Sequence, residues 1–278
     1  MRAMRPEEIE KIELYLFLET LYQRYGYDFR HYAQASIRRR VYHLAAKNGY
    51  ARISEMFPRL LYDEDFAQAA IYDFSITVTE MFRDPEFYCS LRKNVVPYLK
   101  TYPFIKIWHA GCATGEEVYS LAIVLREEGL YDRATIFATD FNEAILEKAK
   151  EGIYAFKDIR QYTTNYQKAG GTCSFADYYH AQYESAIMDQ SLKKNITFAS
   201  HNLVTDGVFG EMHLIFCRNV LIYFDKTLQN RVLGLFSDSL HYSGYLCLGS
   251  KETLEFSNVA NRFKAVDTPV KIYQKRSV

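Results

Sequence analysis

The sequence predicts an α/β fold with a seven-stranded, doubly wound sheet preceded by an all-helical domain. From about Tyr102 onward, short apolar runs alternate with amphipathic helical stretches, which is typical of parallel strands joined by crossover helices. The last two apolar runs are separated only by Asp267-Thr268-Pro269, which predicts an antiparallel hairpin at the end of the sheet. Before residue 72, apolar residues recur at helical spacing instead.

The segment from about Pro6 to Ile71 is predicted to be helical. Gly26 and Gly49 are expected to separate its helices. We expect residues 1–75 to form one domain and residues 76–278 a second, which begins with a linker at 76–86. Two series of apolar residues have the spacing of a helix face: Ile9, Ile12, Leu16 and Leu18, then Ile37, Val41, Leu44 and Ala45.

The second domain is predicted to alternate strands and helices. The expected parallel strands are Ile105–Trp108, Thr135–Thr139, Ile196–Ser200, His213–Cys217 and Tyr245–Leu248. The expected helices are Glu116–Glu128, Asn142–Lys150 and Lys226–Leu240, and the closing antiparallel strands are Phe263–Val266 and Val270–Gln274. The polar, tyrosine-rich segment Gly152–Asn195 is too long for a structureless loop. We expect it to form a helix and a small β-insertion within about 155–194, with a hairpin turn at Gly170-Gly171.

Composition and charge are those of an ordinary globular protein. The 278 residues are 49% hydrophobic and 24% charged, and the net charge is zero, so no nucleic-acid partner is expected. The five cysteines form no C-x-x-C pair and no cluster with zinc-ligand spacing, so no metal is expected. The N-terminus is charged and no apolar run approaches the ~18 residues of a membrane helix. We therefore expect a cytoplasmic protein without membrane insertion.

A glycine loop follows the first predicted strand, at the edge where open parallel sheets bind ligands. Gly111 and Gly115 permit close backbone approach and a tight turn into a helix. The loop matches neither the dinucleotide-binding motif nor the P-loop motif. Glu116 and Glu117 follow at once, and two carboxylates suit a ligand with an ammonium or sulfonium charge better than a phosphate. The alternative is a glycine turn with an acidic first helical turn.

Polar residues also follow the next two predicted strands. Asp140 ends the second strand, where an acid typically accepts hydrogen bonds from ribose hydroxyls. An N-cap for the helix beginning at Asn142 is an equally good interpretation of Asp140. After the third strand, Asn202 and Leu203 offer an amide and an apolar contact to an adenine, although an Asn in such a loop can simply complete a turn.

The chain after the fourth strand reads Arg218-Asn219-Val220-Leu221-Ile222-Tyr223. A strand tip gains no packing from an Arg-Asn pair, so these residues are expected to face a reaction centre. A structural ion pair to Asp225 or Glu252 is the alternative. The linker Thr77–Asp84 reads locally as a polar connection with a helix-capping threonine, and its place between the domains makes it a lid over the cleft.

Together these segments resemble the chemotaxis receptor glutamate O-methyltransferases, the CheR-type family, over essentially the whole chain. Each segment is short, but the ordered set is specific. The resemblance implies a class I S-adenosylmethionine-dependent methyltransferase domain with an N-terminal helical domain and a small β-subdomain. The matching segments are Tyr27–Arg30, Ser36–Arg40, Thr79–Pro85, Ala110–Ser120, Ala138–Asp140, Gly152–Tyr154, Asn202–Leu203 and Phe216–Asp225.

The resemblance also implies roles for individual residues. Tyr223 matches a position close to the transferable methyl, and Tyr223 and Arg83 are the catalytic candidates. Many relatives have Asn where this chain has Thr77, and paired aromatics where it has Met81-Phe82. The implied cofactor-binding residues are Thr77, Thr79 and Arg83 in the linker; Gly111, Cys112, Gly115 and Glu117 at the methionine portion; Asp140 and Phe141 near the ribose; Asn202 and Leu203 at the adenosine; and Asn219 and Val220 near the sulfonium.

The implied reaction needs few catalytic groups. A glutamate side chain has a reference pKa near 4.3, so the nucleophile is ionised at pH 7 and no general base is required. Aligning the two reactants can contribute roughly 7–11 kcal/mol. An N-methyltransferase acting on bases would show an Asn/Asp-Pro-Pro-aromatic motif after the fourth strand, which this chain lacks. A sensor that binds S-adenosylmethionine without turnover would show the same binding residues.

A basic segment indicates the acceptor. Between Gln23 and Leu60 there are eight Lys or Arg residues against two acids, and Arg38, Arg39 and Arg40 are the substrate-binding candidates. A positive face would attract an acidic helical region of a receptor or other protein. A solvated helix face and an RNA-binding surface are the alternatives. We expect the protein to be a monomer.

Overall fold

The computed structural model describes residues 4–75 and 78–277. The chain divides into two compact units. The N-terminal unit comprises Met1–Ile76 together with Ile222–Gln229, and the C-terminal unit comprises Thr77–Leu221 together with Asn230–Val278. A short segment that follows the fourth predicted strand therefore belongs with the N-terminal helices. Within the described residues, no helix is both long and apolar enough to cross a membrane.

The N-terminal unit is helical, as predicted. Its elements are α1 (Pro6–Tyr25), α2 (Gln34–Lys47), the 3₁₀ helix η1 (Ile53–Met56), α3 (Phe57–Tyr62) and α4 (Glu64–Phe74). Gly26 ends α1 with a left-handed φ of 79°, and Asp63 caps α4 by accepting the N–H of Phe66. Of the two predicted apolar series, the one on α2 is buried. On α1, Leu18 of the predicted series is buried together with Phe17 and Leu21, whereas Ile9, Ile12 and Leu16 are exposed.

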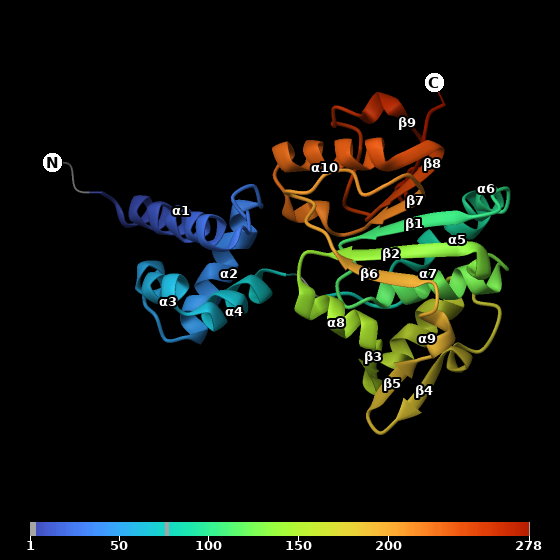
Figure 1. The fold of residues 1–278 in the computed structure, drawn as a ribbon, viewed down its shortest axis with the longest axis horizontal. Coiled ribbons are helices and arrows are strands. Elements are labelled where there is room, and N and C mark those ends of the chain that lie inside the picture. The colour runs from blue at the N-terminus through green and yellow to red at the C-terminus, as the bar shows by residue number, and fades with distance from the viewer. Residues whose placement is uncertain (1–3, 76–77, 278) are drawn as a thin grey trace. The chain divides into compact units, whose positions relative to one another are not determined.

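The C-terminal unit contains the predicted seven-stranded sheet, in the order β6-β2-β1-β7-β8-β10-β9 (Figure 1). The first five of these strands are parallel, and β10 and β9 close the sheet in antiparallel fashion. The strands are β1 (Ile105–Ala110), β2 (Ala134–Asp140), β6 (Ile196–Ser200), β7 (Met212–Cys217), β8 (Leu240–Leu248), β9 (Phe263–Asp267) and β10 (Ile272–Lys275).

The helices of this unit are α5 (Pro85–Asn94), α6 (Val96–Leu99), α7 (Glu116–Glu127), α8 (Glu143–Glu151) and α9 (Ile159–Lys168), and α10 (Lys226–Ser239) begins in the segment assigned to the N-terminal unit. Every residue of α7 from Glu116 to Leu125 is buried. Polar side chains on a helix that is buried on all sides need hydrogen-bond or charge partners. Glu116 and Glu117 must therefore have such partners within the protein.

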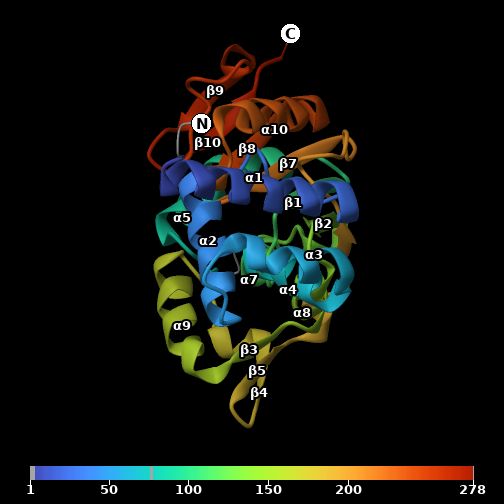
Figure 2. The same ribbon diagram turned by 90° about the vertical axis from the view of Figure 1, so that its left-hand side faces the viewer.

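The β-insertion is a three-stranded sheet, β3 (Ile153–Ala155), β5 (Ser185–Met188) and β4 (Tyr179–Gln182), in the order β3-β5-β4. Figures 1 and 2 show it beside α9 and apart from the main sheet. The predicted hairpin turn at Gly170-Gly171 is wrong, because the hairpin β4–β5 turns at 183–184, where Tyr183 has a φ of 52°. The two glycines follow α9 instead. Gly171 packs against the ring of Tyr166, where a Cβ atom would lie 2.2 Å from that ring.

Candidate functional site

The glycine loop, residues 111–115, is fastened to the end of β2. The N–H groups of Gly111 and Cys112 both donate to the carbonyl of Thr139, at 2.8 and 2.9 Å. Gly111 and Gly115 have left-handed φ values of 75° and 90°. A Cβ atom at Gly111 would lie 2.6 Å from Cγ2 of Val220. The loop after β1 therefore touches the segment after β7, and this contact requires glycine.

Asp140 ends β2 beside the glycine loop and is half-buried. Its Oδ2 accepts the N–H of Ala113 at 3.1 Å, and its Oδ1 accepts the N–H of Asn142 at 3.1 Å. Burial raises the pKa of Asp140, and these N–H donors oppose the rise. The N-cap of α8 is Asn142, whose Oδ1 accepts from Ala144 and Ile145. Asp140 is thus not the helix cap, and its oxygens keep lone pairs for further donors.

Asn202 and Leu203 lie in the turn after β6. The Oδ1 of Asn202 accepts the N–H of Val204 at 2.9 Å, and its own N–H donates to Asp206 at 2.9 Å. The amide oxygen therefore completes a turn, which is one of the two roles predicted for Asn202. Its Nδ2 group makes no hydrogen bond to the described residues. Leu203 is buried. Phe141, next to Asp140, is half-buried.

Arg218 lies at the end of β7 in a buried ion-pair network. Its side chain is 2% exposed; Nη1 pairs with Glu117, and Nη2 pairs with Asp84 at 2.7 Å. Nη1 also donates to the carbonyl of Arg83 at 3.3 Å. The predicted ion pair at this strand tip therefore exists, but its partners Asp225 and Glu252 were wrong. Glu252 instead accepts the N–H of Asn219 at 3.0 Å.

Glu117 is held on both sides within this network. His109 Nε2 lies 3.1 Å from Glu117 Oε2, and Arg218 pairs with the other oxygen. Burial raises the pKa of Glu117, but Arg218 and His109 outweigh it and lower the pKa to about 2. Sequence reasoning missed this network. The signal in the sequence was that Arg218 follows one predicted strand and Glu117 follows the loop after another, so that the two side chains could meet at one edge of the sheet.

The linker is attached to α7. The N–H of Phe82 donates to Ser120 Oγ at 2.9 Å, and Phe82 is fully buried. Thr79 and Arg83 are half-buried, and Arg83 Nη1 lies 3.4 Å from the carbonyl of Val78. Thr77 lies outside the described residues. Residues 82–84 of the linker are therefore held to α7 through Phe82 and to the end of β7 through Arg218.

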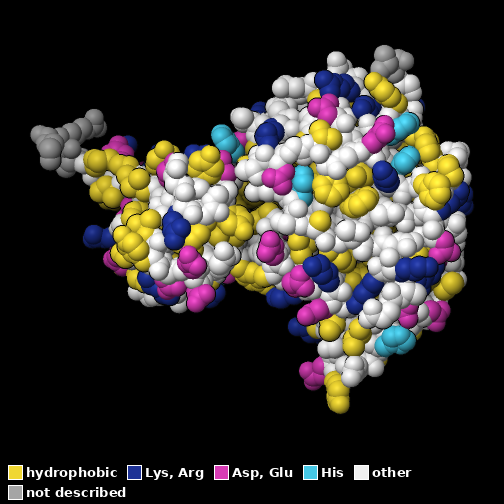
Figure 3. Space-filling model, viewed as in Figure 1, with side chains coloured by type: hydrophobic (Ala, Val, Ile, Leu, Met, Phe, Trp, Pro, Cys, Tyr) yellow, Lys and Arg dark blue, Asp and Glu magenta, His cyan; other side chains and the backbone are white. Residues whose placement is uncertain are grey.

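The remaining candidates belong to the N-terminal unit. The carbonyl of Tyr223 accepts the N–H of Ala33 at 2.7 Å. Arg38 and Arg39 are exposed, and Arg38 pairs with Glu10. Arg40 is the exception to the expected outward face, because it is half-buried and donates to the carbonyl of Asp73 at 2.7 Å. On the face drawn in Figure 3, basic and acidic side chains are interspersed.

Glu116 is a buried acid in the first turn of α7, 6% exposed, and its Oε2 accepts the hydroxyl of Thr114 at 2.6 Å. Burial raises its pKa from the usual 4.5 to about 7. The folded state thus binds this proton more tightly than the unfolded state. The stabilising contribution is full below about pH 4.5 and is lost as pH rises through about 7. The difference corresponds to about 3 kcal/mol.

Glu116→Gln is therefore expected to become more stable relative to the wild type as the pH rises from 5 to 8, because an amide can accept the Thr114 hydroxyl and cannot ionise. Urea denaturation of both proteins at pH 5 and pH 8 measures this. Parallel pH dependence in the two proteins would contradict the assignment to Glu116.

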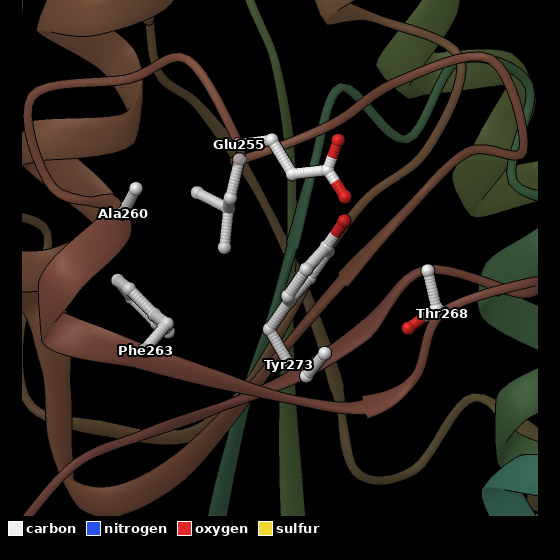
Figure 4. Close-up of a pocket in the computed structure, with 7 residues that line it drawn as sticks. Glu255, Ala260, Phe263, Thr268 and Tyr273 are labelled. Atoms are coloured by element: carbon white, nitrogen blue, oxygen red, sulfur yellow. The ribbon is translucent and has the colours of Figure 1, made fainter.

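A pocket of about 140 Å³ lies away from these residues, between the chain after β8 and the β9–β10 hairpin. Figure 4 shows the side chains of Phe263 and Tyr273 at this pocket, with the carboxylate of Glu255 and the hydroxyl of Tyr273 pointing toward one another. None of the sequence-predicted site residues lines it. Among the described residues, no group of three or more His, Cys, Asp or Glu side chains is placed to hold a metal.

Comparison with known proteins decides the family. Residues 77–272 match the SAM binding domain of CheR methyltransferases, and residues 12–75 match their all-alpha domain. The chain belongs to the CheR methyltransferase family. Its C-terminal domain is thus an S-adenosylmethionine-binding methyltransferase domain of class I. The residues at the ends of β1, β2, β6 and β7 lie at the carboxyl edge of its parallel strands, which is the edge where open α/β sheets generally bind ligands.

Relatives match this CheR-family chain over most of its length. It is 49% identical to the protein Cher3 of Pseudomonas putida, over 98% of this chain and all of that one. It is 30% identical to the chemotaxis protein methyltransferase of Listeria innocua, over 89% of this chain and 92% of that one. The chemotaxis protein methyltransferase of Salmonella typhimurium is 32% identical, over 70% of this chain and 66% of its own.

Proposed function

We propose that this protein transfers the methyl group of S-adenosylmethionine to glutamate side-chain carboxylates of another protein, first of all a methyl-accepting chemotaxis receptor. The products are a glutamate methyl ester and S-adenosylhomocysteine. One observation carries the proposal. The Asp140 carboxylate accepts the N–H of Ala113 and so holds the glycine loop at the strand-end edge of a CheR-type domain. The names of the Listeria and Salmonella relatives support the chemotaxis acceptor.

The residues at this edge fit the cofactor. Val220 occupies the space that a side chain at Gly111 would need, and we propose that the cofactor lies along the backbone of this glycine loop. The Asp140 carboxylate has lone pairs available for the two ribose hydroxyls, and Nδ2 of Asn202 is free to donate to an adenine. We propose further contacts to the cofactor from Thr77, Thr79, Arg83, Cys112, Gly115, Glu117, Phe141, Leu203, Asn219 and Val220.

The chemistry asks little of the chain beyond positioning. S-adenosylmethionine supplies an activated methyl group. A glutamate acceptor is ionised at pH 7, so this chain must align the carboxylate and exclude water rather than remove a proton. We propose that Tyr223 orients the acceptor carboxylate or lines the path of the methyl group. We propose that Arg83, from the linker, also acts at the site of methyl transfer. Substitutions at the site should therefore act mainly through binding.

The acceptor surface that we propose is the exposed part of α2. Arg38 and Arg39 are both exposed there, and opposite charge on an acidic helix would increase the rate of encounter. Arg40 has its guanidinium bonded to Asp73, so we give it a supporting place at the edge of this surface. We further propose that the protein acts as a monomer in the cytoplasm.

One assay tests the proposal. The protein is incubated with methyl-labelled S-adenosylmethionine and the cytoplasmic fragment of a methyl-accepting receptor, and the product is then treated with mild base. Release of labelled methanol is expected, because a carboxyl methyl ester hydrolyses under these conditions. The matched control is the same fragment with its methylation-region glutamates replaced by alanine. A base-stable label would overturn the carboxylate acceptor, and binding of the cofactor without labelling of any acceptor would favour a sensor.

A further inference from the structure

Tyr154 makes a direct hydrogen bond from the β-insertion to the glycine loop. It occupies the centre of β3, is 7% exposed, and donates its hydroxyl to the carbonyl of Thr114 at 2.8 Å. The same hydroxyl packs on the next residue, because a Cβ atom at Gly115 would lie 3.3 Å from it. One hydroxyl group therefore fixes a carbonyl of the loop and, together with Ala149 of α8, fills the space beside its last glycine.

The loop needs such support because its backbone is strained. Gly111 and Gly115 have left-handed φ values, and Ala113 between them has a φ of 48°. A residue with a Cβ atom is sterically strained in this region, so neighbouring contacts must hold it there. Asp140 holds Ala113 from the β2 side, and Tyr154 holds Thr114 from the side of the β-insertion. These two residues restrain the 112–113 and 114–115 peptide units, one on each side of the 113–114 unit.

Tyr154 is itself firmly placed. It pairs with Ala186 of β5, and its ring meets those of Tyr119 and Tyr162 edge to face at 6.1 and 6.3 Å. Burial raises the pKa of Tyr154 well above its usual value, so the hydroxyl remains a donor at neutral pH. The position of the hydroxyl is therefore set by the three-stranded sheet together with the rings from α7 and α9.

We propose that Tyr154 is a positioning residue, through which the three-stranded sheet holds the glycine loop in its cofactor-binding conformation. The inference rests on the use of S-adenosylmethionine and not on the identity of the acceptor. It gives the β-insertion a role at the cofactor site, because any change in that sheet which moves β3 also moves the carbonyl of Thr114. Tyr154 need not touch the cofactor for this effect.

Tyr154→Phe tests the proposal, with Tyr131→Phe as a matched control. Tyr131 is also buried and donates its hydroxyl to a backbone carbonyl, that of Leu192, but it precedes β2, at the end of that strand opposite the glycine loop. Both variants lose one buried hydroxyl that donates to a carbonyl and should lose similar stability. Tyr154→Phe is expected to bind S-adenosylmethionine roughly three- to tenfold more weakly, whereas Tyr131→Phe should bind as the wild type does.

Isothermal titration with S-adenosylmethionine and thermal unfolding of the same samples measure both quantities. Equal affinities for S-adenosylmethionine in the two variants would overturn the proposal. This holds if both variants bind as tightly as the wild type, and also if both bind more weakly in proportion to their loss of stability. Equilibrium binding needs no acceptor. The experiment therefore decides the role of Tyr154 even if the methanol assay fails to show a glutamate ester.

Discussion

Replacing Arg218 with methionine is expected to lower the free energy of unfolding by about 3–5 kcal/mol. The side chain is 2% exposed, and its guanidinium lies between Glu117 and Asp84 and over the ring of Phe87. Methionine can fill much of this volume. It leaves the Glu117 carboxylate buried beside His109 without its strongest partner, and an unpaired buried charge is the large cost. Urea denaturation at pH 7 measures the loss.

Two further variants make this prediction specific. Arg262→Met removes a cation whose pair with Asp238 is exposed, with side chains 54% and 61% accessible, and should change stability by about 0–1 kcal/mol. The double variant Arg218→Met, Glu117→Leu removes both charges and should regain most of the loss. A loss below about 1 kcal/mol in Arg218→Met, or no recovery in the double variant, would show that the buried pair does not stabilise this edge of the sheet.

The fold could be predicted from the sequence because its signals are periodic and local. Parallel strands buried on both faces read as short apolar runs, and the run of three turn residues at 267–269 marked the closing hairpin. The hairpin of the β-insertion could not be located in the same way. Gly170-Gly171 indicates left-handed backbone, which serves equally to end a helix, whereas Tyr183-Glu184 carries no turn signal at all.

Burial on α1 shows the same limit. The spacing of Ile9, Ile12 and Leu16 predicts a helix, but a periodic apolar series does not say what covers it. The side of α1 that packs is the one bearing Phe17 and Leu21. The period of a helix is a property of its own sequence, whereas the choice of buried face depends on the elements around it.

Positions in the site could be predicted, but their partners could not. The strand-end rule placed Asp140, Gly111 and Asn219 at one edge, since the carboxyl ends of parallel strands meet there. The acids that pair with Arg218 are 101 and 134 residues away in sequence, whereas the alternative of a structural ion pair named only Asp225 and Glu252. Tyr154 lay in the matching segment Gly152–Tyr154 but was given no role, because its contribution is one hydroxyl group that reaches the glycine loop, 40 residues away in sequence.

Asp140→Ala is expected to weaken the binding of S-adenosylmethionine by about 100-fold or more. A hydrogen bond to a charged group contributes about 1.5–3 kcal/mol, and the proposed contact involves two ribose hydroxyls. The substitution also removes the acceptor that holds the N–H of Ala113, so the glycine loop loses one of its restraints. Isothermal titration measures the affinity. Asp132→Ala is the matched control, because this exposed acid lies just before the opposite end of β2.

Asp140→Asn separates the two contributions of the carboxylate. The amide oxygen can still accept from Ala113 or from one ribose hydroxyl, so an intermediate loss is expected, and unchanged affinity in both variants would remove Asp140 from the ribose. The affinity of the wild type should also fall at acidic pH. Burial raises the pKa of Asp140, so its carboxylate takes up a proton at a higher pH than an ordinary aspartate and then accepts less well. The Asp140→Ala variant should lack this part of the pH dependence, which ties the acid-side loss of affinity to one carboxylate at the end of β2.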